Sequence, residues 1–214
     1  MIEISVLSGG SIGTNCYILQ DQKNNAALID FVPEAEDYLI KNNLKIKILF
    51  LTHIHFDHIE GLAVFQKKNN FDFCLSSEAY DFFKNPSAGS SILSFFPPDI
   101  MDNIKNISLN NTKILSEGGS VLFDYEAIKA FKSPGHSPDG LIFSLDNYKI
   151  IFSGDTLFYG SVGRTDLPGG DFTEIEKSIK RIYSLFSDDY KVFPGHGPAT
   201  SIGFERKNNP YVRA

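Results

Sequence analysis

The stretch Thr52-His53-Ile54-His55-Phe56-Asp57-His58 gathers four potential metal ligands. It directly follows the apolar run 46–51, whose branched and aromatic side chains predict a buried β-strand. Because side chains alternate along an extended chain, His53 and His55 should point to the same side and bind one ion from adjacent positions. The ligands are therefore expected where a strand ends.

Asp57 and His58 follow where the periodicity of apolar residues changes. Residues 59–65 have helical spacing, so the two side chains are expected in the turn that enters a helix, where they can face a second ion. A single histidine is more often a core or surface residue than a ligand. A buried cluster of imidazoles and a carboxylate without metal, however, would leave unpaired polar groups at a cost of several kcal/mol. The cluster therefore predicts a metal site.

Three further candidate ligands also follow strand-like runs. The chain has only five histidines, and the two outside the first cluster, His136 and His196, each end a Pro-Gly-His triplet after the apolar runs 127–131 and 190–193. Asp155 comes after a third such run. Gly-Asp-Thr is also an ordinary turn, but Asp155 completes a set of five His and two Asp, and we interpret it as a ligand.

Read in order, these residues match the motif set of the metallo-β-lactamase superfamily, and the match spans almost the whole chain. Within that superfamily the chain resembles the glyoxalase II group, the hydroxyacylglutathione hydrolases, and especially its short bacterial members, which lack the C-terminal helical domain. That domain contributes basic residues to glutathione binding, and only a short segment follows His196 here. The stretches that carry the group resemblance are Thr14-Asn15-Cys16-Tyr17, Gly154-Asp155-Thr156-Leu157-Phe158, the run 163–171 and Asn209-Pro210-Tyr211.

The resemblance implies an α/β (α+β) fold, the four-layer αββα metallo-β-lactamase sandwich, with two divalent metal ions per chain. It implies that one ion is bound by His53, His55 and His136. The other would be bound by Asp57, His58 and His196, with Asp155 and a hydroxide as bridges. Zinc is the expected ion, with iron and manganese as alternatives. Two such ions outweigh two aspartates and one hydroxide by a single positive charge, which suits an anionic intermediate.

This ligand set predicts a hydrolase. A divalent metal lowers the pKa of bound water to about 7 and polarises a carbonyl oxygen, so Asp57 and Asp155 are expected to be catalytic as ligands. The group resemblance implies a small-molecule hydroxyacyl thioester such as S-D-lactoylglutathione as substrate. A thioester suits this chemistry because its thiolate leaves without strong protonation.

Two residues just beyond Asp155 are candidate substrate contacts. Arg164 offers a fixed fork for a substrate carboxylate; a structural salt bridge to Asp166 or Asp171 is an equal alternative. Tyr159 is the second candidate. The glycines around them match no phosphate-binding loop.

Other activities of the same superfamily remain open to different degrees. Persulfide dioxygenases resemble this chain but use one iron bound by two His and one Asp, and the ligands alone do not exclude that. Hydrolysis of another ester or amide is a further alternative. Flavodiiron chemistry is disfavoured because His55 stands where those proteins carry Glu. Lactamase activity is disfavoured by Asp155, ribonuclease activity by the lack of basic patches, and a non-catalytic role by the complete ligand set.

Composition limits the partners. The 20 Lys and Arg against 26 Asp and Glu give a net charge of −6, without a basic block that could follow a phosphate backbone. No run approaches the length of a membrane span, and the start lacks a signal-peptide pattern. We expect a cytoplasmic protein, a monomer or small homo-oligomer, that binds neither nucleic acid nor membrane. Cys16 and Cys74 are expected to be buried thiols.

The chain is expected to form one domain, residues 1–214. Apolar runs predict strands over 2–7, 15–20 and 26–30 as an antiparallel meander, and a helix over 33–42 leads to the strand before the ligand stretch. Residues 84–103 are expected to be irregular, either as a packed surface loop or as a flap over the site. Further strands are expected over 71–75, 113–115, 120–123, 141–145 and 149–152, and helices over 78–83 and 171–186, the latter with a capping box.

Overall fold

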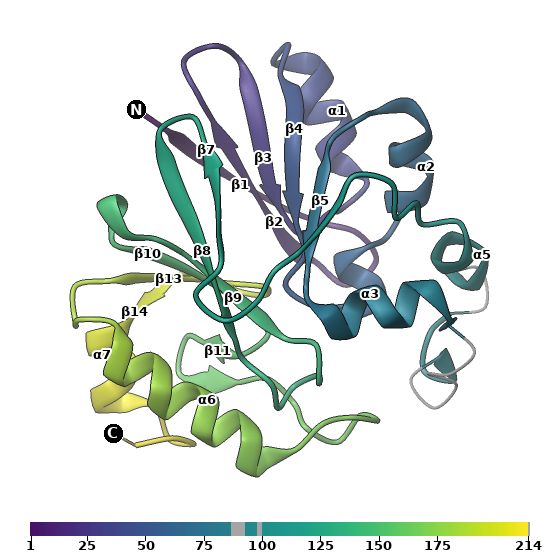
Figure 1. Cartoon of the computed structure of the whole chain (residues 1–214). Helices are drawn as coiled ribbons and strands as arrows, with labels where there is room; N and C mark the ends of the chain where they lie inside the picture. The colour runs from purple at the N-terminus through teal and green to yellow at the C-terminus, as the bar shows by residue number, and fades with distance from the viewer. Residues whose placement is uncertain (87–92, 98–99, 214) are drawn as a thin grey trace. The chain divides into compact units, whose positions relative to one another are not determined.

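The computed structural model describes residues 1–86, 93–97 and 100–213 (Figure 1). The chain forms two compact units, Met1–Ile114 and Leu115–Ala214, which we call the N-terminal and the C-terminal unit. Each combines one six-stranded sheet with helices. The expectation of a single domain over 1–214 stays a prediction.

The sheet of the N-terminal unit begins as an antiparallel meander and continues as a parallel sheet. Its order follows the chain, from β1 to β6. As predicted, the first three strands are antiparallel; the pairs β3–β4, β4–β5 and β5–β6 are parallel. Parallel pairing directs the carboxyl ends of β4 and β5 to the same edge of the sheet. The strands are β1 (Glu3–Gly9), β2 (Thr14–Gln20), β3 (Asn25–Ile29), β4 (Lys45–Phe50), β5 (Asp72–Leu75) and β6 (Thr112–Ile114).

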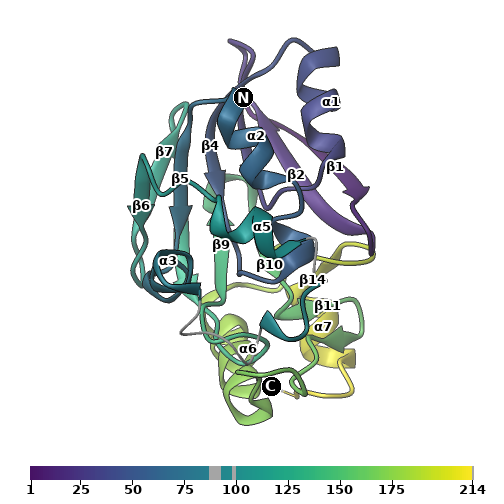
Figure 2. The ribbon, with the colours of Figure 1, turned by 90° about the vertical axis from the view of Figure 1, so that its right-hand side faces the viewer.

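Helices cover one face of this sheet, as Figures 1 and 2 show. They are α1 (Glu34–Lys41), α2 (Leu62–Lys68), α3 (Ser77–Lys84) and α5 (Ile100–Lys105). Their apolar sides share one core with the strands, in which the rings of Phe31 and Phe65 lie 4.6 Å apart. Burial of these side chains, at about 25 cal/mol per Å² of apolar surface, holds the helices on the sheet.

Two local expectations for this unit need correction. The helix expected over 59–65 begins only at Leu62, because Gly61 has a left-handed φ of 78° that interrupts helical geometry. Residues 100–103, expected to be irregular, lie in α5. The rest of the expected loop includes residues 87–92 and 98–99, which lie outside the described residues, so its role as a flap stays a prediction.

The C-terminal unit has a sheet in the order β14-β13-β10-β9-β8-β7. Neighbouring strands from β7 to β10 are antiparallel, whereas β10 and β13 are parallel. The strands are β7 (Ser120–Phe123), β8 (Glu126–Lys132), β9 (Leu141–Leu145), β10 (Ile150–Gly154), β13 (Lys191–Pro194) and β14 (Thr200–Ser201). A separate hairpin of β11 (Leu157–Phe158) and β12 (Ser161–Val162) follows β10; the sequence patterns did not predict it.

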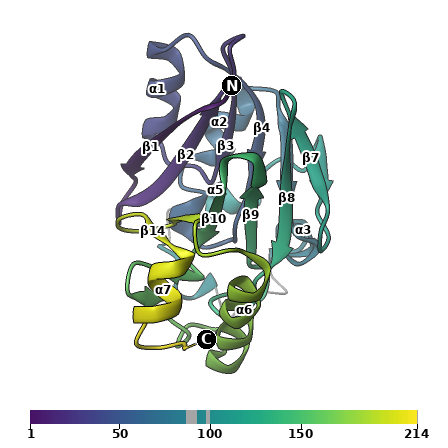
Figure 3. The same ribbon diagram turned by 90° about the vertical axis from the view of Figure 1, so that its left-hand side faces the viewer.

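Helices α6 (Phe172–Leu185) and α7 (Ile202–Asn208) lie side by side in this unit (Figure 3). The predicted capping box is confirmed at its first half, since the Asp171 side chain accepts a hydrogen bond from the backbone N–H of Glu174 at 3.1 Å. Ile175, Ile179 and Ile182 form the buried stripe of α6, as their spacing predicts. Helix α7 was not predicted.

The two cysteines are buried free thiols, as predicted. Burial raises the pKa of Cys74 to about 12 and that of Cys16 further still, so both are protonated at neutral pH. Neither is a thiolate nucleophile. Among the residues that the structure describes, none of the helices combines the length and the apolar character that crossing a membrane requires.

Candidate metal centre

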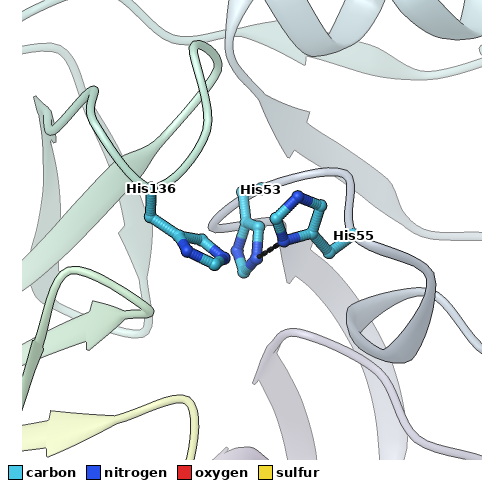
Figure 4. A group of neighbouring side chains, drawn as sticks. All are labelled: His53, His55 and His136. Carbon is cyan, nitrogen blue, oxygen red and sulfur yellow. Dashed lines mark hydrogen bonds between the residues drawn. The ribbon is translucent and has the colours of Figure 1, made fainter. Parts of the chain in front are cut away.

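His53 and His55 lie just beyond the carboxyl end of β4, where the chain has left the sheet but stays buried. Their side chains point toward each other, and Nε2 of His53 is 3.1 Å from Nδ1 of His55 (Figure 4). The rings are nearly perpendicular, at 79°. Two ring nitrogens that face each other in this way can be joined by one proton or can share one cation.

Asp57 and His58 lie in a short 3₁₀ turn, Phe56–His58, ahead of α2, in the turn before a helix as predicted. Both side chains are buried, and Oδ2 of Asp57 is 3.3 Å from Nε2 of His58. Ligand atoms bound to one zinc ion at about 2.0–2.1 Å in tetrahedral geometry lie about 3.3–3.4 Å apart. The spacing of both pairs in this stretch therefore fits the donor atoms of metal ions.

Asp30 holds the stretch 52–58 through hydrogen bonds to its first and last residues. The sequence patterns did not identify Asp30 as functional. Its Oδ1 accepts the backbone N–H of Thr52 at 2.8 Å, and its Oδ2 lies 2.8 Å from the Thr52 hydroxyl and 2.7 Å from Nδ1 of His58. The residue is buried and has a left-handed φ of 60°, which Asp tolerates better than most residues. The one signal in the sequence that could have identified Asp30 is that a carboxylate directly follows the buried strand β3.

These hydrogen bonds assign the histidine tautomers. Because the Asp30 carboxylate accepts only, Nδ1 of His58 carries a proton, and in the neutral imidazole the lone pair is then on Nε2. The Thr52 hydroxyl donates to Asp30 and therefore accepts from Nδ1 of His53, 3.0 Å away, so Nε2 of His53 also has its lone pair. A carboxylate behind a ligating histidine is a common outer-shell arrangement that raises the basicity of the ligand.

Thr14, at the start of β2, supports the carboxylate of the stretch. Its hydroxyl donates to Oδ2 of Asp57 at 2.5 Å, with both groups buried. A short bond from a neutral hydroxyl to an oxygen favours the ionised carboxylate. Thr14 thus positions the Asp57 carboxylate.

The C-terminal unit brings together three predicted ligands that lie far apart in the sequence. Oδ2 of Asp155 is 3.5 Å from Nε2 of His136 and 3.6 Å from Nε2 of His196. Both distances are close to the spacing of two ligands on one ion. Asp155 and His196 approach because they follow the parallel strands β10 and β13, whose ends are joined by a bond from the N–H of Gly195 to the carbonyl of Gly154 at 2.8 Å.

Backbone groups and close packing hold these ligands. Nδ1 of His136 donates to the carbonyl of Arg164 at 2.8 Å, which leaves the lone pair on Nε2. Gly135 has a φ of 132° and packs so closely that a Cβ would lie 2.2 Å from the backbone nitrogen of Ile175. At Gly163 a Cβ would lie 1.8 Å from the carbonyl oxygen of Asp155. No larger residue fits at Gly135 or Gly163 without a backbone shift.

The two candidate substrate contacts lie in exposed positions. Arg164 makes a bidentate salt bridge to Asp166, with both N–O distances 2.7 Å, so the structural alternative is present. The Arg164 bond holds the pKa of Asp166 at about 2. The ring of Tyr159 stacks on Phe204 at 4.9 Å and 12°. Substrate binding by Arg164 and Tyr159 stays a prediction.

The donor chemistry of both units fits divalent metal ions. Imidazole nitrogens and carboxylate oxygens are ligands of zinc, iron and manganese. Five of the seven candidate ligands are buried, and the side chain of Asp155 is 11% exposed. The side chain of His196 is 27% exposed. An exposed ligand leaves room for solvent or substrate beside it.

Known proteins resemble this chain over its whole length. The hydroxyacylglutathione hydrolase GloC of Haemophilus influenzae is 31% identical over 217 residues, covering 100% of this chain and 99% of that protein. The crystal structure of BLEG-1 B3 metallo-beta-lactamase superposes with a TM-score of 0.82 and 30% identity over 99% and 100% of the two chains. TTHA1623 in a di-iron-bound form superposes with a TM-score of 0.79 and 30% identity over 97% and 100%.

The sequence also matches the profile of the metallo-beta-lactamase superfamily over residues 9–196, a range that includes all seven candidate ligands. The solved structures confirm the fold predicted from the sequence. The family profile, the curated relative and the solved structures together confirm the family resemblance. The chain belongs to the metallo-beta-lactamase superfamily.

Proposed function

We propose that the ligands of the two units form one binuclear metal centre and that the protein is a thioester hydrolase. One ion would be held by the group His53, His55 and His136, drawn in Figure 4, and the other by Asp57, His58 and His196. Asp155 would bridge them. The observation that carries the proposal is the set of imidazoles and carboxylates with ligand-pair spacing in each unit, all of them buried except Asp155 and His196, which are partly buried.

When bound, two divalent ions would lower the pKa of water to supply the nucleophile and would polarise the carbonyl of the substrate. The protein's own residues prepare the site for this role. Asp30 and Thr52 accept Nδ1–H of His58 and His53, which directs Nε2 of each toward an ion, and Thr14 donates to Asp57. No positioned general base is needed, which agrees with the assignment of all five histidines as ligands.

A hydroxyacyl thioester such as S-D-lactoylglutathione is the proposed substrate, and zinc is the proposed ion. The resemblance to the glyoxalase II group and the 31% identity to a hydroxyacylglutathione hydrolase over its full length support this choice. Iron is the principal alternative ion, since one similar structure is described in a di-iron-bound form. The carboxylate of such a substrate would suit Arg164, with Tyr159 nearby in the chain. A cytoplasmic location, a small-molecule partner and the monomeric or small homo-oligomeric state stay predictions.

The experiment is elemental analysis of protein purified without added metal, beside a lactoylglutathione hydrolysis assay on the same sample. We expect nearly two metal ions per chain and thioester turnover, with both lost after dialysis against a chelator and regained with zinc. Arg164→Ala should raise KM more than it lowers kcat. Metal at two equivalents without turnover of any hydroxyacyl thioester would contradict the substrate.

Two other activities give different results on the same sample. One iron per chain, no hydrolysis and oxygen consumption with glutathione persulfide would identify a mononuclear-iron dioxygenase. Hydrolysis of another ester or amide is the second alternative. A β-lactam is the amide to test, although Asp155 disfavours it, because a B3 metallo-beta-lactamase is among the similar structures at 30% identity. A higher kcat/KM with a β-lactam than with lactoylglutathione would favour lactamase activity. A higher kcat/KM with another ester or amide would favour that substrate class.

A further inference from the structure

The β11–β12 hairpin continues directly from the candidate bridging ligand. Leu157 anchors it in the core of the C-terminal unit. The ring of Phe158 lies 6.3 Å from the ring of His196, edge to face at 77°. At the end of the hairpin, Gly163 packs against the backbone of Asp155 so closely that a Cβ would be 1.8 Å from its carbonyl oxygen. A displacement of the hairpin would therefore move the surroundings of both ligands.

Glu205 of α7 holds the turn of this hairpin. It is completely buried. Its Oε1 accepts the hydroxyl of Thr200 at 2.6 Å, its Oε2 accepts Nδ2 of Asn209 at 2.8 Å, and both oxygens lie 3.1 Å from the backbone nitrogen of Gly160. Gly160 is the turn residue, with a left-handed φ of 61°. The neighbouring Arg206 pairs with Asp188 instead, so the donors around the Glu205 carboxylate are neutral.

Two more contacts join the hairpin to α7 and to the segment after it. Nδ2 of Asn209 also donates to the carbonyl of Ser161 in β12 at 3.2 Å. Its Oδ1 accepts the backbone N–H groups of Tyr211 and Val212 at 3.0 and 3.3 Å. On the outer side, the stack of Tyr159 on Phe204 links the turn to the same helix. Helix α7 and Asn209 directly after it thus hold the turn and β12 of the hairpin.

A carboxylate is costly to bury and is retained only where its hydrogen bonds are satisfied. A carboxylate accepts without donating, so one group can take bonds from the three donors at once. A carboxamide of the same shape would turn an N–H₂ group toward one of those donors. The identity of residue 205 therefore decides whether the turn is held.

We infer that Glu205 is a positioning residue of the metal centre. It fixes the hairpin on α7, and the hairpin in turn fixes the backbone of Asp155 and the ring of Phe158 beside His196. This inference rests on the proposed function only in taking Asp155 and His196 as metal ligands. It is independent of the substrate.

The test is Glu205→Gln in the full chain, loaded with cobalt(II) as a spectroscopic probe. We expect altered position and intensity of the visible cobalt bands, because they report the geometry of the ligands, and about 10- to 100-fold weaker binding of at least one ion in competition with a chelator. Glu174→Gln is the matched control. Glu174 is a glutamate of α6 paired with Lys177 at 2.8 Å on the surface, so its variant should reproduce the wild-type spectrum.

Thr200→Val removes one neutral donor and keeps the carboxylate, so it should shift the spectrum and the affinity in the same direction by a smaller factor. It decides the question if Glu205→Gln does not fold. Wild-type cobalt spectrum and affinity in a folded Glu205→Gln protein, or in Thr200→Val when the first variant is unfolded, would overturn the positioning role even if the melting temperature fell. A wild-type chain that binds no cobalt would overturn the metal centre itself, so the two failures are distinguishable.

Discussion

The two units position the same kinds of ligand in different ways. The N-terminal unit takes four candidate ligands from one short stretch and holds three of them with other side chains, the Asp30 carboxylate and the hydroxyls of Thr14 and Thr52. The C-terminal unit takes three candidate ligands from distant loops and holds them with a backbone carbonyl at His136 and with close glycine packing. The first arrangement should be sensitive to removal of a charge or hydroxyl, and the second to added volume.

Loss of the candidate bridging ligand should have the largest effect. Asp155→Asn keeps the shape of the side chain but removes the charge that two cations would share. We expect loss of the second metal and a fall in kcat/KM of at least about a thousandfold, or about 4 kcal/mol of transition-state stabilisation. Metal analysis and thioester hydrolysis on one preparation measure both. Unchanged stoichiometry with full turnover would contradict the bridging role.

Added volume should be the next most damaging change, and only in the C-terminal unit. Gly163→Ala places a methyl group 1.8 Å from the Asp155 carbonyl, so the backbone must shift. We expect a loss of about 3 kcal/mol in the free energy of unfolding, with weaker metal binding, measured by urea denaturation and chelator competition.

Gly160→Asn is the control for Gly163→Ala. It lies in the same hairpin, faces open space and keeps its N–H, and Asn tolerates a left-handed φ. Equal effects of the two variants would argue against packing at Gly163 as the cause.

Removal of the Asp30 charge should weaken metal binding by the N-terminal unit. Asp30→Asn preserves the left-handed backbone but turns an acceptor into a donor beside Nδ1 of His58 or the Thr52 groups. We expect about 10- to 100-fold lower metal affinity, measured by chelator competition. Asp124→Asn is the matched control, because Asp124 also has a left-handed φ, of 54°, in the turn between β7 and β8. Wild-type affinity in Asp30→Asn would show that the outer carboxylate is dispensable.

A smaller effect is expected from Thr14→Val, which removes the hydroxyl that donates to Asp57. One hydrogen bond to a charged group contributes about 1.5–3 kcal/mol, and a ligand retained by its metal should lose less. We expect a fall in kcat/KM of about tenfold, with a change in metal affinity of the same order. Thr14→Ser, which keeps the hydroxyl, should restore most of the activity; failure of Ser to restore it would point to the lost methyl contact.

The smallest effect concerns the surface pair of Arg164 and Asp166. The hydrogen bond from Arg164 holds the pKa of Asp166 at about 2, below its ordinary value of about 3.9. A carboxyl with a lowered folded-state pKa stabilises the protein above the unfolded pKa and loses this contribution as the pH falls toward 2. Melting temperatures of Asp166→Asn and wild type should therefore differ slightly at pH 7 and converge at the acid end. A difference that grows toward low pH would contradict the assignment.

The local patterns of the chain predicted the close approach of two candidate ligands in the N-terminal stretch, and their role as metal ligands stays a prediction. A short run fixes its own spacing, so the facing pair of His53 and His55 could be derived from alternation along an extended chain. The start of the helix after this stretch could not be derived in the same way, because Gly61 has a left-handed φ and α2 begins only at Leu62. Asp30 also escaped prediction, since its role depends on a hydrogen bond to His58 across the sheet edge, and a single Asp after a strand has many ordinary uses.

In the C-terminal unit the sequence supplied the identities of His136, Asp155 and His196 through Pro-Gly-His triplets, a strand-end Asp and the family resemblance. Only the tertiary structure brought Asp155 within 3.6 Å of both histidines, and its approach to His196 depends on the parallel pairing of β10 with β13. The short β11–β12 hairpin and the buried Glu205 that holds it have no local signature. The sequence determines which side chains have the chemistry of metal ligands. The distances between them depend on non-local hydrogen bonds and packing, which form only when the chain folds.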